Sequence, residues 1–480
     1  MAVTTTSGSG PGKKPGSSAH ASPGDATQTT DFEAPRSGRS PKDRKLGPRG
    51  ESRVGAWGIT SLLVSLYVIN YADKAVLGII AQPLREELGL SSSQIGLVGS
   101  LFFLTFTIGG FFAGLLNRWM TLRWSLVLLA LCWAAAMLPM VVVAGFGVLI
   151  VSRLFLGLAE GPSSALLHTA AYSWHPPARR ALPGALLAGA ASISKIAVAP
   201  LLAVITVTFG WRWALISLTI GGLAWCVVWL ATWRNGPYIA SGKTTKGATA
   251  AADTDAEPTT PWISIFTSRT FITGALVVMS VYALVSVVLT WLPSYFEEGL
   301  GYSRLQSGSM FAFPSIVGLI LMVLSSITSD RMISRGATSR MLRIVVPSVG
   351  VLVSGVLLFL LPSISTPIVA VAILSIGYGF AATVFPLFNA AVAEICPPRQ
   401  TAGTLGVFLA IMAIGGLVAP YATGVIVDAA GTPAEGYATA FQVLGLVAAV
   451  CAVLALVFAD PERDRARLRP HAPTVEGATA

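Results

Sequence analysis

Long apolar runs follow one another along most of the chain, and short polar breaks separate them. Each run holds roughly the ~20 residues that an α-helix needs to cross a bilayer. The pattern predicts twelve helices, at 55–80, 94–116, 123–144, 146–173, 182–208, 211–233, 270–293, 306–329, 342–361, 366–394, 402–427 and 437–459. Residues 234–261 form the only long polar break among them. We therefore expect an all-α membrane protein with two six-helix bundles.

Composition supports this class. The 480 residues are 54% hydrophobic and only 11% charged, whereas a soluble protein is typically about a quarter charged. A soluble multidomain enzyme and a disordered or fibrous chain are therefore excluded. The four cysteines, Cys132, Cys226, Cys396 and Cys451, lie far apart in apolar runs. Such spacing indicates neither a disulfide framework nor a zinc site, and we expect no metal and no cofactor.

The polar segments divide the chain into five parts. Residues 1–53 are rich in Ser, Gly, Pro and charge, so they cannot bury a core and are expected to form a disordered cytoplasmic tail. The first bundle is predicted over 54–233 and the second over 270–460. A cytoplasmic linker at 234–269 joins them, and 461–480 form a second cytoplasmic tail.

Basic residues set the expected orientation. If both termini lie on one side, nearly all Lys and Arg outside the helices fall on that side, and only Arg85, Arg212 and Arg304 fall on the other. Basic loops stay in the cytoplasm, so both termini are predicted to be cytoplasmic. The net charge of +10 then forms a solvated rim, and no nucleic-acid partner is needed to explain it.

The two halves repeat one another. Pro83 at the end of the first helix corresponds to Pro293 at the end of the seventh, and Pro200 corresponds to Pro420. Asn117-Arg118 after the second helix corresponds to Asp330-Arg331 after the eighth. These matches keep one order, as expected for a duplicated six-helix unit. Parallel repeats of this kind place a substrate site at the midplane between the halves.

Five ionisable residues interrupt the apolar helices, and all five belong to the N-terminal half. Each costs several kcal/mol or so unless it is paired or hydrated, and its default interpretation is a functional site. They are Asp73, Lys74, Arg153, Glu160 and Lys195. Three cations and two carboxylates leave a formal charge of +1, which an organic anion would neutralise. We expect them to surround one aqueous vestibule.

Structural alternatives stay open for these residues. Asn70, Asp73 and Lys74 are three and four residues apart, so they share a helix face, and Asp73 with Lys74 could be a self-neutralising pair. Arg153 and Glu160 are about two turns apart, or ~10 Å, and could form a static salt bridge with another helix.

Lys195, in the middle of the fifth helix, suits either anion binding or a structural role. His168 and Asn389 are weaker candidates, because such residues are more often hydrogen-bonded in a helix core.

The charges suggest a coupling mechanism. If Asp73 or Glu160 is protonated, the pocket becomes more positive and an anion binds better. Departure of the anion favours release of the proton if the carboxylates can pair again with Arg153 or Lys74. Because linkage is reciprocal, this arrangement predicts proton–anion symport.

Several stretches resemble a known family. The twelve-helix plan is similar to the major facilitator superfamily across 55–460, with two pseudo-symmetric six-helix bundles. Within it, four segments resemble the anion:cation symporter family, which includes bacterial sugar-acid transporters. These are Asn70-Tyr71-Ala72-Asp73-Lys74, Leu88-Gly89-Leu90-Ser91, Arg153-Leu154-Phe155-Leu156-Gly157-Leu158-Ala159-Glu160 and Phe209-Gly210-Trp211-Arg212-Trp213-Ala214.

The resemblance implies roles for the matching residues. Asp73 and Glu160 correspond to proton-coupling carboxylates, and Lys74 and Arg153 to basic residues that contact the substrate or gate its path. Tyr71 and Asn389 are implied polar contacts. Lys74 replaces the arginine of many relatives, so it cannot hold a carboxylate in a bidentate fork. Lys195 has no counterpart in the family pattern, and it could favour a dianion.

The resemblance also bears on gating. Arg118, Asp330 and Arg331 match the loop signature that latches the inward gate. Asn117 stands where that signature has an acid, which puts the closing of the N-terminal latch in doubt.

We therefore expect a secondary transporter that takes up a small organic anion with protons. It would work as a monomer in the inner membrane of a bacterium, as the composition rich in Ala, Gly, Val and Arg suggests. An exporter of drugs or metabolites within the same superfamily is the alternative, but a basic pocket repels the cations that drug exporters often carry. A receptor or an enzyme is the third reading, although no nucleophile–base or metal constellation is visible in the sequence.

Overall fold

The computed structural model describes residues 53–175, 181–234, 236, 260–364, 366–397 and 400–470. Every regular element within these ranges is a helix. Twelve helical segments in this described part are long and apolar enough to cross a membrane. The predicted all-α class and the twelve spans are thereby confirmed. The predicted tail to residue 52, most of the linker and residues 471–480 lie outside the described ranges.

Six spans form the N-terminal half. They are α1 (Arg53–Leu88), α2 (Ser92–Gly110), α4 (Leu122–Val142), α5 (Phe146–Glu160) with α6 (Ser163–Tyr172), α7 (Ala181–Ile193) with the π-helical turn η3 (Ser194–Val198) and α8 (Ala199–Phe209), and α9 (Trp211–Thr232). A short helix, α3 (Ala113–Trp119), follows α2.

Six further spans form the C-terminal half. They are α12 (Arg269–Ser294) with η4 (Tyr295–Gly299), α13 (Arg304–Met310) with α14 (Phe313–Ile333), η5 (Met341–Val345) with α15 (Val346–Phe359) and η6 (Leu361–Ser363), α16 (Pro367–Ala382) with α17 (Val384–Ile395), α18 (Thr401–Ala429), and α19 (Pro433–Phe458). Two short helices flank this half, α11 (Trp262–Phe266) and α20 (Pro461–Leu468).

Some helix bounds differ from the prediction. We expected the first helix to end near residue 80, but α1 continues to Leu88 with Pro83 inside it. A proline is tolerated there because neighbouring helices compensate for the lost backbone hydrogen bond. We also expected the chain after residue 460 to be a tail, yet α20 folds there, and Asp460 caps it by accepting a hydrogen bond from the Arg463 amide at 3.0 Å.

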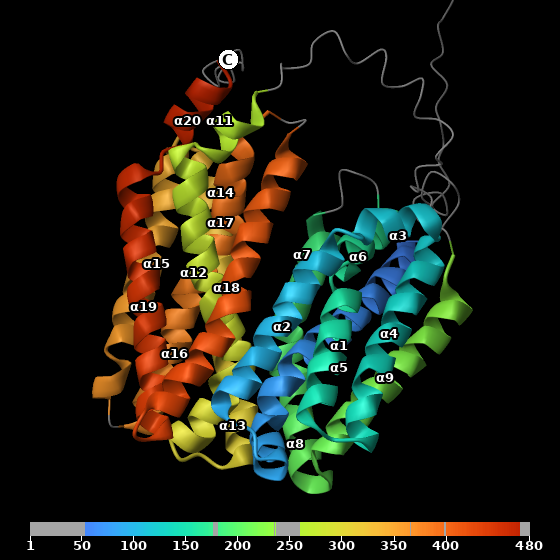
Figure 1. Cartoon of the computed structure of the whole chain (residues 1–480). Helices are drawn as coiled ribbons and strands as arrows, with labels where there is room; N and C mark the ends of the chain where they lie inside the picture. The colour runs from blue at the N-terminus through green and yellow to red at the C-terminus, as the bar shows by residue number, and fades with distance from the viewer. Residues whose placement is uncertain are drawn as a thin grey trace, which may run out of the picture. The chain divides into compact units, whose positions relative to one another are not determined.

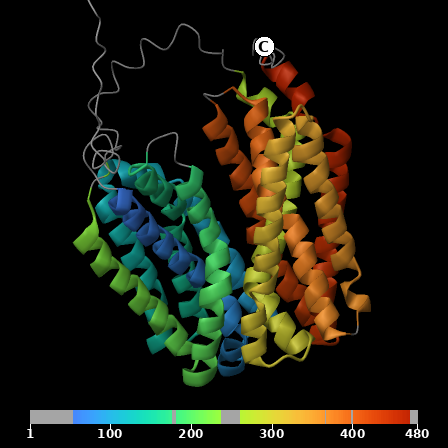
Figure 2. The ribbon, with the colours of Figure 1, turned by 180° about the vertical axis from the view of Figure 1, so that it is seen from behind.

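Related helices join the two halves. In Figure 1 and Figure 2 the helices from α1 to α9 gather in one group and those from α12 to α19 in another. Across the halves, α1 packs against α12, α2 against α18, and α7 and α8 against α14 and α13. The second helix of each half therefore contacts the fifth helix of the other, as a duplicated unit requires.

Glycines bring α2 and α18 close together. A Cβ added at Gly96 would overlap the main chain of Pro420, and one added at Gly424 would overlap the main chain of Ser92. Small residues allow such an approach of two helix backbones in a membrane. This contact places the start of α2 beside the end of α18.

Charged contacts reinforce the same end of the molecule, which we call the α13 end. It comprises the C-terminal ends of α1 and α18, the start of α2, and α13 with η4 (Figure 1). Arg85 pairs with Glu298 at 3.0 Å, and Arg304 pairs with Glu86 at 2.7 Å. The Asp428 carboxylate accepts hydrogen bonds from the Ser92 and Ser93 amides at 2.8 and 2.7 Å. Each contact connects the two halves.

The opposite end of the C-terminal half has its own polar network. Asp464 of α20 accepts a hydrogen bond from the Thr270 amide at 2.9 Å. Glu394, at the end of α17, pairs with Arg343 at 2.8 Å and with Arg465 at 3.5 Å. This network attaches α20 to the ends of α12 and α17.

We predict that Asp428→Asn weakens the α13 end. The neutral amide is a poorer acceptor for the Ser92 and Ser93 amides, and because the site is exposed the cost is about 1 kcal/mol. A cysteine at Ser100, whose Oγ accepts a hydrogen bond from the Tyr421 amide at 3.1 Å, should react faster with a maleimide in this variant. The comparison uses a parent that lacks the native cysteines. Glu435→Gln, an exposed acid in the first turn of α19, serves as the control, and equal labelling of both variants would contradict the prediction.

Candidate functional site

The five intramembrane charges are all removed from solvent in the structure. Asp73, Arg153, Glu160 and Lys195 are buried, with exposed fractions from 0% for Glu160 to 6% for Lys195. The Lys74 side chain is also only 6% exposed. Such groups need partners, because dehydrating an unpaired charge costs several kcal/mol or so. Four of them have a partner in the structure, whereas the Asp73 side chain lines a small pocket.

Lys74 and Glu160 form a buried ion pair. Lys74 Nζ of α1 lies 2.7 Å from Glu160 Oε2 of α5. The same ammonium donates a hydrogen bond to Asn70 Oδ1, one helical turn earlier. It also lies 4.7 Å from the Tyr71 ring centroid and 5.0 Å from that of Phe106, so two aromatic faces add cation–π attraction. Lys74 is therefore held by one carboxylate, one amide and two rings.

Arg153 binds the backbone of α1. Its Nη1 donates a hydrogen bond to the main-chain oxygen of Asp73 at 3.0 Å, using the second lone pair of a helical carbonyl. Among the described residues, no carboxylate lies within ion-pair distance of this guanidinium. Arg153 therefore fixes α5 to α1 while its positive charge stays without a directly bonded anion.

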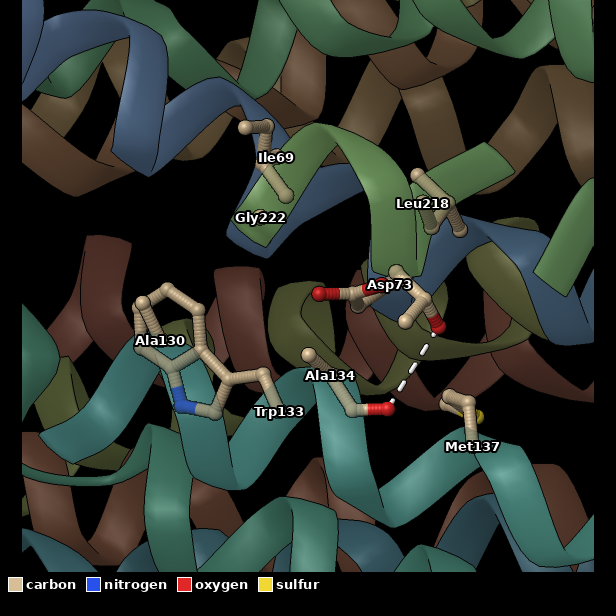
Figure 3. A pocket seen from close by; sticks show the side chains of 9 residues that line it. Ile69, Asp73, Ala130, Trp133, Ala134, Met137, Leu218 and Gly222 are labelled. Atoms are coloured by element: carbon tan, nitrogen blue, oxygen red, sulfur yellow. Dashed lines mark hydrogen bonds between the residues drawn. The ribbon is translucent and has the colours of Figure 1, made fainter. Parts of the chain in front are cut away.

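Asp73 differs from our expectation of one shared vestibule. Its side chain lines a small pocket between α1, α4 and α9, which is shown in Figure 3. The other lining residues are Ile69, Ala130, Trp133, Ala134, Met137, Leu218, Thr219 and Gly222. Consecutive residues of a helix point about 100° apart. Asn70 and Lys74 therefore share one face, while Ile69 and Asp73 share another.

Lys195 connects the two halves. It lies in the π-helical turn η3, a rare element that is frequent at functional sites. Its Nζ donates a hydrogen bond to the Tyr378 hydroxyl of α16 at 3.1 Å. η3 also packs against α1 and α14. Within the described ranges Lys195 has no carboxylate partner, so this buried ammonium is bonded only to a neutral oxygen.

Aromatic and amide side chains of both halves are further candidates for contact with a substrate. Tyr71 packs on Tyr67 with ring centroids 4.9 Å apart. Phe103 of α2 packs against Tyr282 of α12 in the other half, with ring centroids 5.8 Å apart. Asn389 is half-buried in α17, and its Oδ1 has no hydrogen-bond partner in the described part of the chain. A ligand could therefore use this oxygen.

His168 is half-buried and makes contacts within the N-terminal half. Its Nδ1 lies 2.8 Å from the Ser164 main-chain oxygen, and its ring meets those of Tyr67 and Tyr172. The hydrogen-bonded role is therefore one interpretation of His168, and its part in transport stays a prediction.

The predicted gating residues do not form a network in the described part of the chain. Asp330 and Arg331 are exposed at the end of α14, and no ion pair within the described ranges includes either one. The side chain of Arg118 lies outside the described part. Glu394, which sequence analysis did not select, instead forms ion pairs with Arg343 and Arg465. Its only sequence signal was an acid near a helix end opposite a basic loop.

No group of three or more His, Cys, Asp or Glu side chains in the described residues is arranged to hold a metal ion. What the arrangement offers is a buried positive region that can bind an anion and two carboxylates that can bind protons. Twelve spans in two repeated halves with such a centre define a multi-pass membrane transporter.

Comparison with known proteins identifies the family. The model of the Major Facilitator Superfamily matches residues 63–384 and 343–479, and the chain belongs to this superfamily. Among solved structures, it is similar to a bacterial homologue of the lysosomal transporter Spinster in an inward-facing, occupied conformation (17% identity, 88% of this chain, all of the other, TM-score 0.71). It is equally similar to a D-xylose–proton symporter (17% identity, 85% and 99% covered, TM-score 0.71). These matches establish the fold.

Curated relatives are more similar in sequence. A hexuronate transporter of Bacillus subtilis is 26% identical over 82% of this chain and 92% of its own length. A probable sulfoacetate transporter of Cupriavidus necator is 28% identical, with 84% and 93% covered. A probable galactarate/D-glucarate transporter of Bacillus subtilis is 27% identical, with 85% and 93% covered.

We predict that Lys74 and Glu160 are energetically coupled. Lys74→Met and Glu160→Gln each leave one buried group without its partner, whereas the double variant removes both charges. The double variant should therefore lose less stability than the two single losses combined, with a coupling energy of about 1–3 kcal/mol. Thermal unfolding of the purified protein in detergent measures this. Lys195→Met combined with Glu160→Gln is the control and should be additive; equal additivity in both cycles would contradict the pairing.

Proposed function

We propose that this protein takes up a small organic anion together with protons, by alternating access. The observation that carries the proposal is the Lys74–Glu160 ion pair, with two further buried cations near α1 that lack a carboxylate partner among the described residues. Three cations and two carboxylates give the region a formal excess of one positive charge. A bound carboxylate would neutralise this excess.

The ion pair supplies a route for coupling. While Glu160 is ionised, its carboxylate pairs with the Lys74 ammonium and competes with any other anion for it. Protonation of Glu160 removes this competition, and the carboxylate of a substrate can then take its place. Because binding linkage is reciprocal, a proton and a substrate would each increase the affinity for the other. In this scheme Asp73 is the second proton-coupling residue.

Arg153, Tyr71 and Asn389 complete the proposed substrate contacts. Arg153 has donors beyond the one used on Asp73, including Nε, which has no partner in the described part of the chain. The unpartnered Asn389 Oδ1 would accept a hydrogen bond from a hydroxyl group. Carboxylate and hydroxyl groups together describe a sugar acid.

Lys195 provides a second positive group for a larger or doubly charged anion. In the present conformation it donates to Tyr378 across the halves. A second anionic group would compete with the Tyr378 hydroxyl for this ammonium. We propose that Lys195 favours dianions and that its neutral partner keeps it available to them.

The remaining assignments follow the same scheme. Arg118, Asp330 and Arg331 would act in gating at the end where α1 begins, which we place in the cytoplasm with both termini. The two bundles at 54–233 and 270–460 would rock about the site as a monomer in the bacterial plasma membrane. The α13 end, closed by Arg85, Arg304 and Asp428, would then face outward.

The relatives support an anionic substrate. They are a hexuronate transporter, a probable sulfoacetate transporter and a probable galactarate/D-glucarate transporter. All of the named substrates are carboxylates, and two of the groups carry two negative charges. This range agrees with a site that offers Lys74 and Arg153, with Lys195 as a further positive group.

Proteoliposomes with a trapped pH dye provide the direct test. A hexuronate, an aldarate and sulfoacetate are added in turn, and lipophilic cations form a separate panel. We expect one of the carboxylates to be taken up with protons. Carboxylate uptake without proton movement would contradict the coupling, and transport of the cations alone would favour a drug exporter.

We predict that Glu160→Gln separates exchange from accumulation. The amide mimics the protonated acid, so labelled substrate should still exchange across the membrane. Uphill accumulation driven by a pH gradient should be lost, because the proton site is gone. Glu435→Gln, an exposed acid in the first turn of α19, is the matched control. Full accumulation by Glu160→Gln would refute this role.

We predict that Lys195→Met discriminates between charge classes. Removing one charge-assisted contact should weaken dianion binding by roughly tenfold or more, while a monocarboxylate should bind almost as before. Tyr378→Phe, which removes the competing hydroxyl, should keep or improve dianion binding. Competition binding with matched mono- and dianions measures both variants. An equal loss for both classes would reject the assignment.

A further inference from the structure

Asp73 occupies a pocket on a different face of α1 from Lys74. The pocket is lined by α1, α4 and α9, as Figure 3 shows, and Asp73 reaches into it together with Trp133. Neither α4 nor α9 brings a charged side chain to this pocket. Lys74 follows Asp73 on α1, Arg153 and Glu160 of α5 contact α1 at Asp73 and Lys74, and η3, which carries Lys195, packs against α1. None of these four charged side chains lines the pocket.

Two polar groups in this pocket lack direct partners. Trp133 is 2% exposed, and its Nε1 donor has no hydrogen-bond partner in the described part of the chain. Asp73 is 3% exposed, and no hydrogen bond to its carboxylate forms within the described ranges. A buried indole donor and a buried carboxylate each cost free energy when left unpaired. An ionised carboxylate has about four acceptor positions to fill.

The pocket suits one water molecule. It has room for about one water and offers several polar partners. Besides Asp73 and Trp133, it contains Thr219, whose Oγ1 donates to the main-chain oxygens of Leu215 at 3.1 Å and Ala134 at 3.4 Å. Because its hydrogen is used there, Thr219 Oγ1 is free to accept. A cation suits the site less well, since the indole N–H would point at it.

We propose that Trp133 and Thr219 hold one water molecule against the Asp73 carboxylate, and that this water stabilises the ionised form of Asp73. The water accepts a hydrogen bond from Trp133 Nε1 and donates to Asp73 and to Thr219 Oγ1. Trp133 and Thr219 are thus positioning residues, because they act through Asp73 and do not contact the substrate. The inference rests on the proposed function only for the use made of the Asp73 proton.

This placement separates the two proton-coupling carboxylates. Glu160 competes directly with the substrate for Lys74, whereas Asp73 would gain and lose its proton on a different face of α1. Its link to the binding region would run through the backbone, since Arg153 donates to the main-chain oxygen of Asp73 itself. A change in the charge of Asp73 would then reach the substrate through the position of Arg153.

The test is a pH titration of the Asp73 carboxyl by infrared difference spectroscopy. The carbonyl band of the protonated acid is identified by its loss in Asp73→Asn. Trp133→Phe removes the N–H donor and replaces the indole with a smaller ring, so the ionised form loses support. The titration midpoint should move to higher pH by about one unit, since one unit corresponds to about 1.4 kcal/mol. Met137→Leu, a conservative change of an apolar lining residue, should leave the midpoint unchanged.

Further arms keep the inference falsifiable. Thr219→Val keeps the side-chain volume and removes the hydroxyl, and it should move the midpoint in the same direction. It carries the test alone if Trp133→Phe does not fold. Midpoints of Trp133→Phe or Thr219→Val that match Met137→Leu would overturn the proposal. A midpoint that depends on sodium, compared with choline, would assign the pocket to a cation and would also overturn it.

The proposed function fails separately from this inference. If the protein does not couple transport to protons, wild-type proteoliposomes show no substrate-driven proton uptake, yet the infrared shift in Trp133→Phe remains. If only the water site is wrong, proton uptake is normal while the Trp133→Phe titration is unchanged.

Discussion

The cost of placing charge inside a membrane governs this structure. Five ionisable groups lie within apolar helices, and each must recover several kcal/mol or so of lost hydration. Four of them do so through a direct partner, by three different means. Lys74 and Glu160 pair with one another, Arg153 binds a main-chain oxygen, and Lys195 binds a tyrosine hydroxyl. Asp73 lines a small pocket. Only the Lys74–Glu160 pair neutralises charge, and within the described ranges Arg153 and Lys195 are bonded to neutral oxygens alone.

The fold could be predicted from the sequence because bilayer thickness imposes a length on every spanning segment. The twelve apolar runs, the repeat and the five intramembrane charges were all visible without coordinates. Helix ends were less predictable: α1 continues to Leu88 through Pro83, and α20 forms where a tail was expected. Both depend on contacts with other helices, such as the bond between Asp464 and the Thr270 amide.

Partners within the site could not be predicted, because they depend on the rotation of each helix. Asp73 and Lys74 are neighbours in sequence, yet their side chains point to different sides of α1. Tyr378 and Trp133 carried no sequence signal, since an aromatic residue in an apolar helix usually belongs to the core. Glu394 was visible only as an acid near a helix end, and its partners Arg343 and Arg465 come from distant segments. The described ranges do not include the Arg118 side chain, so its part in gating stays a prediction.

The closure at the α13 end has a different character from the buried ion pair. Arg85 with Glu298, Arg304 with Glu86, and Asp428 with the start of α2 are several separate bonds near the surface. Water can replace each of them singly, so none imposes a large barrier by itself. Such a set of contacts holds the two halves together firmly only while all of them are formed. Because each is weak by itself, thermal motion can break them one after another, and the α13 end can open in small steps.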